Sequence, residues 1–169
     1  MDDVREQTAR RVIYGVELQD ADCTQLETAR AFSVMNRDLV RYMEDRERFC
    51  VYDGSRWIID GRGNQRTHEI VQTFIETASR WFSNPKAEVY DKDKAKFFQG
   101  YDSRSKRDQL VKDIESQAVL RCTAKDFDKA KNLLNVKNGT LNLDTGNLEP
   151  HRADDLITMR ADVEYDPKA

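Results

Sequence analysis

The stretch NGTLNLDTGNLEPH, residues 138–151, decides how the carboxy-terminal part of the chain folds. It contains two turn signals, Asn138-Gly139 and Thr145-Gly146, with an alternating apolar and polar segment between them. Asn-Gly pairs suit tight turns because they tolerate positive φ, and alternation has the period of a β-strand. We therefore expect a small β-meander with strands near 133–137, 140–143 and 147–150. Composition and spacing give this stretch no chemistry of its own.

A second β segment is predicted upstream of this meander, within residues 39–59. The pair Asp53-Gly54 separates two strand-like runs, 49–52 and 56–59, and so predicts a hairpin. The run 39–42 is also strand-like, whereas residues 44–47 are too charged for a sheet interior. The segment is therefore expected to be a three-stranded meander.

Two amphipathic helices are predicted between the two β segments. Apolar residues such as Ile70, Phe74 and Ala78 form one stripe over residues 67–82, and Ser-Asn-Pro at 83–85 ends that helix. Ser105 and Asp108 have the spacing of a helix start, which predicts a second helix reaching 118–119. Residues 86–107 are expected to be a charged connector. Upstream, a Thr24-x-x-Glu27 capping box predicts a helix to about residue 35.

The fold class that follows is α+β. It consists of a β-hairpin or meander, two main amphipathic helices, and then a C-terminal small β-meander, to which residues 156–165 add a further possible strand. Strands and helices do not alternate as a doubly wound parallel sheet requires. Residues 1–25 are expected to be an N-terminal arm of unknown role, and residues 26–169 a single domain.

The composition excludes several classes of protein. Hydrophobic residues make up 38% of the 169 residues and charged residues 35%, with a net charge of −3. The aromatic content is sufficient for a core, so global disorder is excluded. No apolar run is long enough for a membrane span, and no signal sequence precedes residue 25, so a cytoplasmic location is expected. The three cysteines are widely spaced, which indicates free thiols and no zinc site.

Motifs for catalysis are weak. The nucleotide-binding pattern GxxxxGK[ST] is absent, and Gly61-Arg62-Gly63 lacks the context of a dinucleotide site. The D-x-D pairs at 91–93 and 126–128 could hold divalent metals for nucleotidyl transfer, but neither lies in an apolar strand, which favours turn or helix-cap roles. His151 has no nucleophile in a recognisable motif, which favours a structural role. No catalytic, cofactor-binding or metal-binding residue is therefore assigned.

Basic side chains provide the only indication of nucleic-acid binding. Cations can neutralise phosphates, and an exposed Trp57 could stack on a base. The alternative is a solvated charged surface with Trp57 inside the hairpin core, and spacing alone favours this alternative. The candidate DNA-binding residues are Arg56, Arg62, Arg66, Lys92, Lys94, Lys96, Arg104, Lys106 and Arg107.

A family resemblance is carried mainly by a carboxy-terminal run. It comprises Phe127-Asp128, Leu133-Leu134-Asn135-Val136, Asn138-Gly139-Thr140-Leu141, Leu143, Thr145-Gly146, Pro150-His151, Asp154-Asp155-Leu156-Ile157-Thr158 and Tyr165-Asp166-Pro167. With the upstream hairpin, this run resembles the domain that precedes the superfamily-three helicase motor in phage, plasmid and poxvirus primase-helicases. The resemblance covers roughly residues 28–169. Its structural signature residues are Trp57, Asn135, Asn138, Gly139, Gly146, Pro150, His151, Asp155 and Tyr165.

The resemblance implies an accessory, collar-type domain that helps a hexameric ring assemble and guides DNA into it during replication. ATP and Mg²⁺ would belong to the parent protein's motor domain, and this chain alone would not be an enzyme. Because the family pattern runs into the motor near residue 169, a fragment of a primase-helicase is expected. The alternatives are a stand-alone protein that joins or inhibits a helicase ring, and a metal-dependent nucleotidyl transferase using a D-x-D pair.

Overall fold

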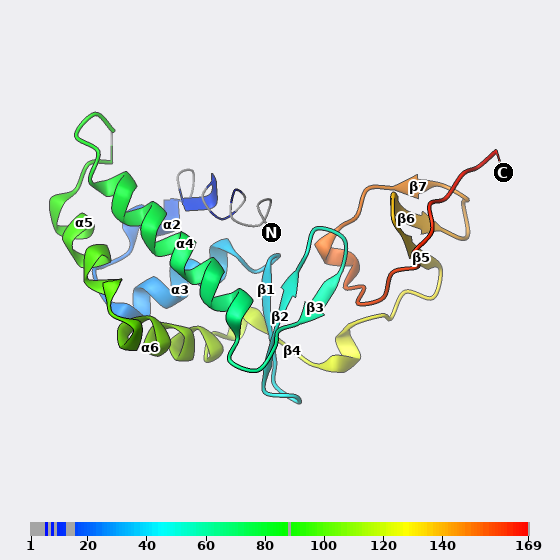
Figure 1. Ribbon diagram of the computed structural model, residues 1–169, viewed down its shortest axis with the longest axis horizontal. Coiled ribbons are helices and arrows are strands. Elements are labelled where there is room, and N and C mark those ends of the chain that lie inside the picture. Colours follow the sequence, from blue (N-terminus) through cyan, green and yellow to red (C-terminus); the bar gives the residue numbers. More distant parts are fainter. Residues whose placement is uncertain (1–5, 7, 9, 13–15, 88, 169) are drawn as a thin grey trace.

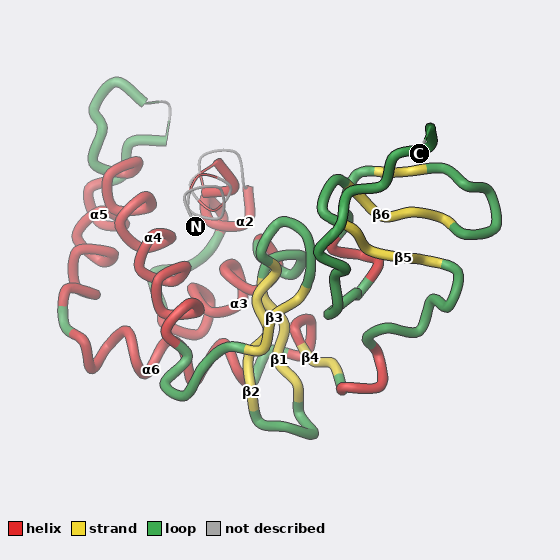
Figure 2. Tube along the Cα trace, turned by 45° about the vertical axis from the view of Figure 1, so that its right-hand side comes forward, coloured by secondary structure: helices red, strands yellow, loops and turns green. Residues whose placement is uncertain are grey.

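The computed structural model describes residues 6, 8, 10–12, 16–87 and 89–168. These residues form a helical layer, a central β-sheet and a small C-terminal β unit, arranged one after another along the longest axis (Figure 1). The end of the chain lies at the far side of the C-terminal unit, remote from the helices. The central sheet therefore separates the helices from the C-terminal unit, as a turned view also shows (Figure 2).

The helical layer contains the longest elements of the chain. Three of these helices begin at a residue whose side chain accepts a backbone N–H of the first turn. The capping residues are Thr24 for α3, Asp91 for α5 and Ser103 for α6. The α-helices are α2 (Val16–Asp20), α3 (Gln25–Met35), α4 (Gln65–Phe82), α5 (Lys92–Gln99) and α6 (Arg104–Glu115).

The central sheet has the strand order β3-β2-β1-β4. Its strands are β1 (Val40–Met43), β2 (Arg48–Tyr52), β3 (Trp57–Ile59) and β4 (Arg121–Cys122). The first three are antiparallel neighbours, and β4 lies parallel to β1. Both faces of β2 are buried, because Phe49 and Val51 face the helices while Cys50 and Tyr52 face the C-terminal unit.

The C-terminal sheet is antiparallel, with the order β5-β6-β7. Its strands are β5 (Leu133–Val136), β6 (Gly139–Asn142) and β7 (Leu148–Glu149). The chain then returns along β5, where the N–H of Lys137 donates to Val163 and the N–H of Ala161 donates to Asn135. These bonds fix the final segment against the sheet without a regular ladder.

Trp57 joins the central sheet to the C-terminal unit. Its side chain is 2% exposed, and its ring packs against Tyr52 and Phe127. Its indole Nε1 donates to the carbonyl of Ala153 at 2.8 Å, and its backbone N–H donates to Ile157. Trp57 is therefore a core residue of the β2–β3 hairpin and not an exposed platform for base stacking.

The α+β class, the hairpin around Asp53-Gly54 and the C-terminal meander are confirmed. The expected connector at 86–107 is wrong, because Phe98 and Tyr101 anchor α5 and a following turn in the core. The second predicted helix begins after Ser103 rather than at Ser105 and ends at Glu115. The central meander gains a fourth strand, β4.

One further expectation needs correction. Within the described residues, 156–165 form no strand, since the segment makes only isolated backbone bonds to its neighbours. Described residues of the N-terminal arm pack into the main core through Val12 and Leu18, and Arg11 forms an ion pair with Asp38. The domain boundary at residue 25 stays a prediction, and parts of 1–15 lie outside the described residues. No helix in the described part of the chain is long and apolar enough to cross a membrane.

Candidate nucleic-acid interface

Two of the candidate cations lie where β3 leads into α4: Arg62 in the connecting loop and Arg66 in the first turn of α4. Both are exposed, and neither side chain forms an ion pair or hydrogen bond within the described residues. Asp60, which is 4% exposed, fixes this loop by accepting bonds from the N–H of Gly61 and from the N–H and hydroxyl of Thr67. These bonds therefore fix the loop that carries Arg62 against the first turn of α4, which carries Arg66.

A groove of about 270 Å³ lies between the first turns of α4 and α6. It is lined by Gly63, Gln65, His68, Gln72, Arg104, Arg107 and Asp108. The groove brings the α6 arginines next to Gly63 and Gln65, the sequence neighbours of Arg62 and Arg66, although some forty residues separate the two segments in sequence. Asp108 partly balances this charge, with Arg104 Nε at 3.7 Å and His68 Nδ1 at 3.8 Å from its oxygens.

The helix α5 presents Lys92 and Lys96 to solvent, and neither ammonium has a partner among the described residues. Lys94 differs, because its ammonium donates to the backbone carbonyls of Leu18 and Gln19 and lies 5.4 Å from the ring centre of Phe82. Lys94 therefore helps to hold α5 against α2. A substitution of Lys94 would test the fold as well as DNA binding.

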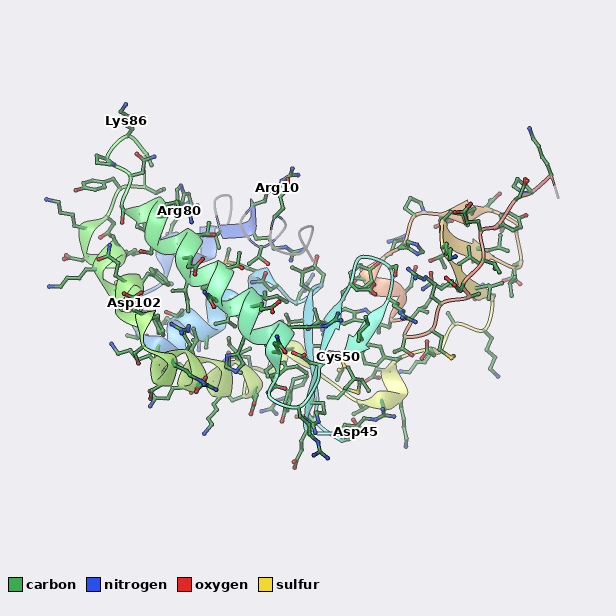
Figure 3. The ribbon with its side chains drawn as sticks, viewed as in Figure 1. Arg10, Asp45, Cys50, Arg80, Lys86 and Asp102 are labelled. Atoms are coloured by element: carbon green, nitrogen blue, oxygen red, sulfur yellow. The ribbon has the colours of Figure 1, made fainter. Side chains whose placement is uncertain are left out.

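The candidate cations thus divide by what they contact. Arg107 donates to the carbonyls of Tyr101 and Asp102 and so stabilises the turn before α6, where Figure 3 labels Asp102. Arg56 lies 3.8 Å from Asp53. The unpaired and exposed members, which remain available to an anion, are Arg62, Arg66, Lys92, Lys96 and Lys106. Whether any of them binds DNA stays a prediction.

A second hollow, the β3 cleft, lies on the face of the central sheet that the C-terminal unit covers. It has a volume of about 450 Å³. It is lined by Met43, Arg46, Arg56, Trp57, Ile58, Ile59, Ala124, Phe127, Asp128 and Thr158. The β1–β2 turn, whose tip carries the labelled Asp45, lies at the lower edge of the molecule (Figure 3). Asp45 accepts the N–H of Ala124, which holds this turn against the cleft wall.

Arginine and apolar surface meet in the β3 cleft. The side chain of Arg46 is exposed and has no hydrogen bond or ion pair within the described residues. The Nε of Arg56 is shielded from solvent and has no hydrogen-bond partner in the described chain. Burial raises the pKa of Asp53, but bonds from the N–H groups of Arg56 and Ser55 outweigh it, so the pKa of this carboxyl lies below its usual range.

Three of the four D-x-D carboxylates form hydrogen bonds inside the fold. Asp91 caps α5. Asp126 accepts from the N–H and hydroxyl of Thr123 and from Lys129, and these bonds lower its pKa to about 2. Asp128 accepts from the N–H and hydroxyl of Thr158. Among the residues that the structure describes, no group of three or more potential metal ligands occurs.

The signature residues lie partly at the joint between the central sheet and the C-terminal unit and partly inside that unit. The amide of Asn135 donates to the carbonyls of Ser55 and Met159. Asn138 pairs with both backbone groups of Tyr165, and its neighbour Gly139 leaves no room for a Cβ beside β7.

Three further signature residues lie in the segment from the β6–β7 turn to residue 155. His151 Nε2 lies 3.3 Å from the carbonyl of Lys137, a structural contact rather than a catalytic pair. Burial raises the pKa of Asp155, although Arg152 acts against this rise. Gly146 adopts a φ of 71° in the turn before β7.

Sequence reasoning missed Arg46 and the cleft itself. Arg46 lies in the charged turn 44–47, whose composition indicated only a solvated loop. The opposite wall comes from Phe127 and Thr158, which are more than eighty residues away from the turn in sequence. Since only tertiary packing brings these residues together, no local pattern could have predicted the cleft.

Comparison with known proteins identifies the family. A family model described as D5 N terminal like matches residues 29–169. No curated protein matches the chain significantly. The matched region includes the central sheet, α4–α6 and the whole C-terminal unit, and so contains both hollows. The chain therefore belongs to the D5 N terminal like family, the N-terminal domains of D5-like phage and poxvirus primase-helicases.

Proposed function

We propose that this chain is an accessory domain of a DNA primase-helicase that assists ring assembly and brings DNA to an ATPase motor outside the chain. The observation that carries the proposal is the family match over residues 29–169. The basic surface formed by the β3–α4 loop, α5 and the start of α6 supports the DNA-binding part. Its unpaired cations can contact phosphates without breaking contacts inside the fold.

The first experiment is to sequence the source reading frame beyond codon 169. An in-frame GxxxxGK[ST] pattern downstream would join this domain to a motor. The continuous protein and a version lacking residues 26–169 would then be compared for assembly mass and ATP-dependent unwinding. Loss of rings in the shortened protein is expected, and intact rings with normal unwinding would refute the role in assembly.

The DNA-binding part is tested on the basic surface. Lys92, Lys96 and Lys106 are changed together to Glu, leaving Lys94 in place because it holds α5. The expected result is loss of the salt-sensitive DNA binding of the chain. The matched control is the triple change of Lys125, Lys131 and Lys168 to Glu, which alters net charge equally outside α5 and α6. Equal losses in both variants would mean that net charge alone governs binding.

We also expect no ATP hydrolysis by the chain alone, because the motor residues would lie outside it. The measurement is phosphate release with Mg²⁺ and ATP after stringent purification. Turnover that survives purification and disappears in an Asp126→Ala or Asp128→Ala variant that keeps its fold would overturn this expectation and support nucleotidyl or phosphoryl transfer instead.

A further inference from the structure

We propose that the β3 cleft binds one nucleotide of a single DNA strand, with its phosphate on Arg46 and Arg56 and its base against the apolar surface at Ile59. The proposal rests on the DNA-binding role given above and names a separate site for the unpaired strand. It is carried by the size of the cleft, its two arginine side chains and its exposed apolar floor.

The size of the cleft suits one nucleotide. Its volume of about 450 Å³ lies within the range of roughly 300–1,000 Å³ that small-molecule sites occupy. The two walls come from different parts of the fold, the central sheet on one side and residues 124–128 with Thr158 on the other. A site of this kind is concave and can enclose a base that has left the stack.

The guanidinium groups are available to a phosphate. Arg46 has no partner among the described residues, and Arg56 has only a loose ion pair with Asp53 at 3.8 Å. The carboxylate that lines the cleft, Asp128, already accepts two hydrogen bonds from Thr158, so it does not occupy either arginine. Arginine presents a planar fork of N–H donors that fits phosphate oxygens, and the terminal N–H groups of Arg56 are not used in a hydrogen bond within the described residues.

The apolar floor is available to a base. Ile59 is 41% exposed, so its side chain is accessible from the cleft. Trp57 contributes little accessible surface, so contact with the base falls mainly on Ile59. The edge position of β3 adds polar groups. The pairing of Val51 with Ile58 directs the N–H and C=O of Ile59 away from β2, where they can bond the edge of a base.

This combination favours a single strand over a duplex. Bases of a duplex are stacked and paired inside it, so a duplex can offer the cleft only its backbone. An unpaired strand can offer a phosphate and an adjacent base face together, and contacts of this kind tolerate any sequence. The cleft would therefore discriminate by strandedness, whereas the basic surface of α5 and α6 would not.

The test measures binding of a fluorescein-labelled oligothymidylate and of the same strand annealed to its complement, over a series of salt concentrations. The variants are Arg46→Ala, Arg46→Ala with Arg56→Ala, and Ile59→Thr, each checked for folding by circular dichroism. Arg48→Ala is the matched control, since it removes one arginine from the same hairpin but does not line the cleft.

The double arginine variant should bind the single strand about tenfold more weakly. Its slope of log K against log salt should also become shallower by about 0.7, because the two arginines hold one phosphate and each lost phosphate contact on a single strand contributes about 0.7. Ile59→Thr should weaken binding of the single strand with an unchanged slope. Duplex binding should change little in all three variants.

Several results would overturn the site. They are an unchanged slope in the double variant, equal losses for strand and duplex, or a loss in Arg48→Ala that equals the loss in Arg46→Ala. Because Arg46 is exposed, its single variant should fold even if Arg56 proves necessary for stability. Failure of the proposed function is distinguishable, because normal rings in the protein that lacks residues 26–169 would refute assembly, whereas strand binding in the cleft is measured separately on the intact chain.

Discussion

Replacing Trp57 with Ala would remove the side chain that joins the central sheet to the C-terminal unit. The ring centre of Trp57 lies 5.6 Å from that of Tyr52 and 6.0 Å from that of Phe127, and 2% of the residue is exposed. Burial this complete predicts a loss of about 3–5 kcal/mol in the free energy of unfolding. The loss should fall in the upper part of that range because the carbonyl of Ala153 would also lose its donor.

The assay is urea unfolding followed by far-ultraviolet circular dichroism and by the fluorescence of Trp81, which lies in α4. Trp57→Phe keeps an aromatic ring but removes the indole donor, so it should cost about 1–3 kcal/mol. Trp81→Ala, followed by circular dichroism alone, is the matched control. Trp81 is only partly buried at the edge of the core, so its loss should be smaller than that of Trp57.

Amide hydrogen exchange would locate the effect. In Trp57→Ala, amides of β5 and β6 should exchange faster than in the unmodified protein, while amides of α4 change less, because the contact removed lies on the C-terminal side of the sheet. A cost below about 1 kcal/mol would refute the reasoning, since changes of that size are typical of exposed positions. It would mean that Trp57 is accessible in solution, and stacking on a base would again be open to it.

Three further predictions concern the backbone, a helix start and the thiols. Gly139→Ala should lower the free energy of unfolding by about 1–3 kcal/mol in thermal or urea unfolding, because the new Cβ would overlap the β7 backbone. Gly61→Ala is the control and should be nearly neutral, because no atom lies within 4 Å of its new Cβ. Asp60→Ala should lower the free energy of unfolding by about 2 kcal/mol or more, since it leaves buried donors at the start of α4 without an acceptor. Burial raises the pKa of Cys50 to about 12, so its thiolate is scarce at pH 8. Cys50 should therefore react with a disulfide reagent far more slowly than the exposed Cys23. Equal reaction rates for the two thiols would contradict the burial of Cys50.

Local patterns predicted the elements whose signals are local. The pair Asp53-Gly54 specifies a turn by its own backbone preferences, and the stripe through Ile70 and Phe74 specifies a helix by its period. Both elements occur as expected, in the β2–β3 hairpin and in α4. Similar reasoning gave the C-terminal meander from Asn138-Gly139 and its neighbours.

Elements that depend on distant partners were missed for a physical reason. The strand β4 has only the residues Arg121 and Cys122, and it exists because β1 offers a free edge, so its own sequence contains no period. The helix α5 was obscured by its many lysines, whose charge indicated a loop. Its Phe98 is 4% exposed and packs against Phe82, a contact that only the folded chain reveals.

The candidate site was predictable only in part for the same reason. Arg104 and Arg107 were both proposed from composition, but their position in one groove beside His68 depends on how α4 packs against α6. Composition also could not distinguish Lys94, which holds α5 against α2, from Lys96, which is free. Charge in a sequence identifies cations, whereas burial and geometry decide which of them an anion can reach.

The Trp57 joint and the β3 cleft share residues, and this links binding to the position of the C-terminal unit. A nucleotide in the cleft would contact β3 at Ile59 and the opposite wall at Phe127 and Thr158. A ligand that touches both walls binds only when the unit is docked, so it stabilises the docked form by mass action. Weakening the joint at Trp57 should therefore lower affinity for a single strand more than for a duplex. Binding of the DNA strand would then stabilise docking of the C-terminal unit, and docking would strengthen binding of the DNA strand by the same factor.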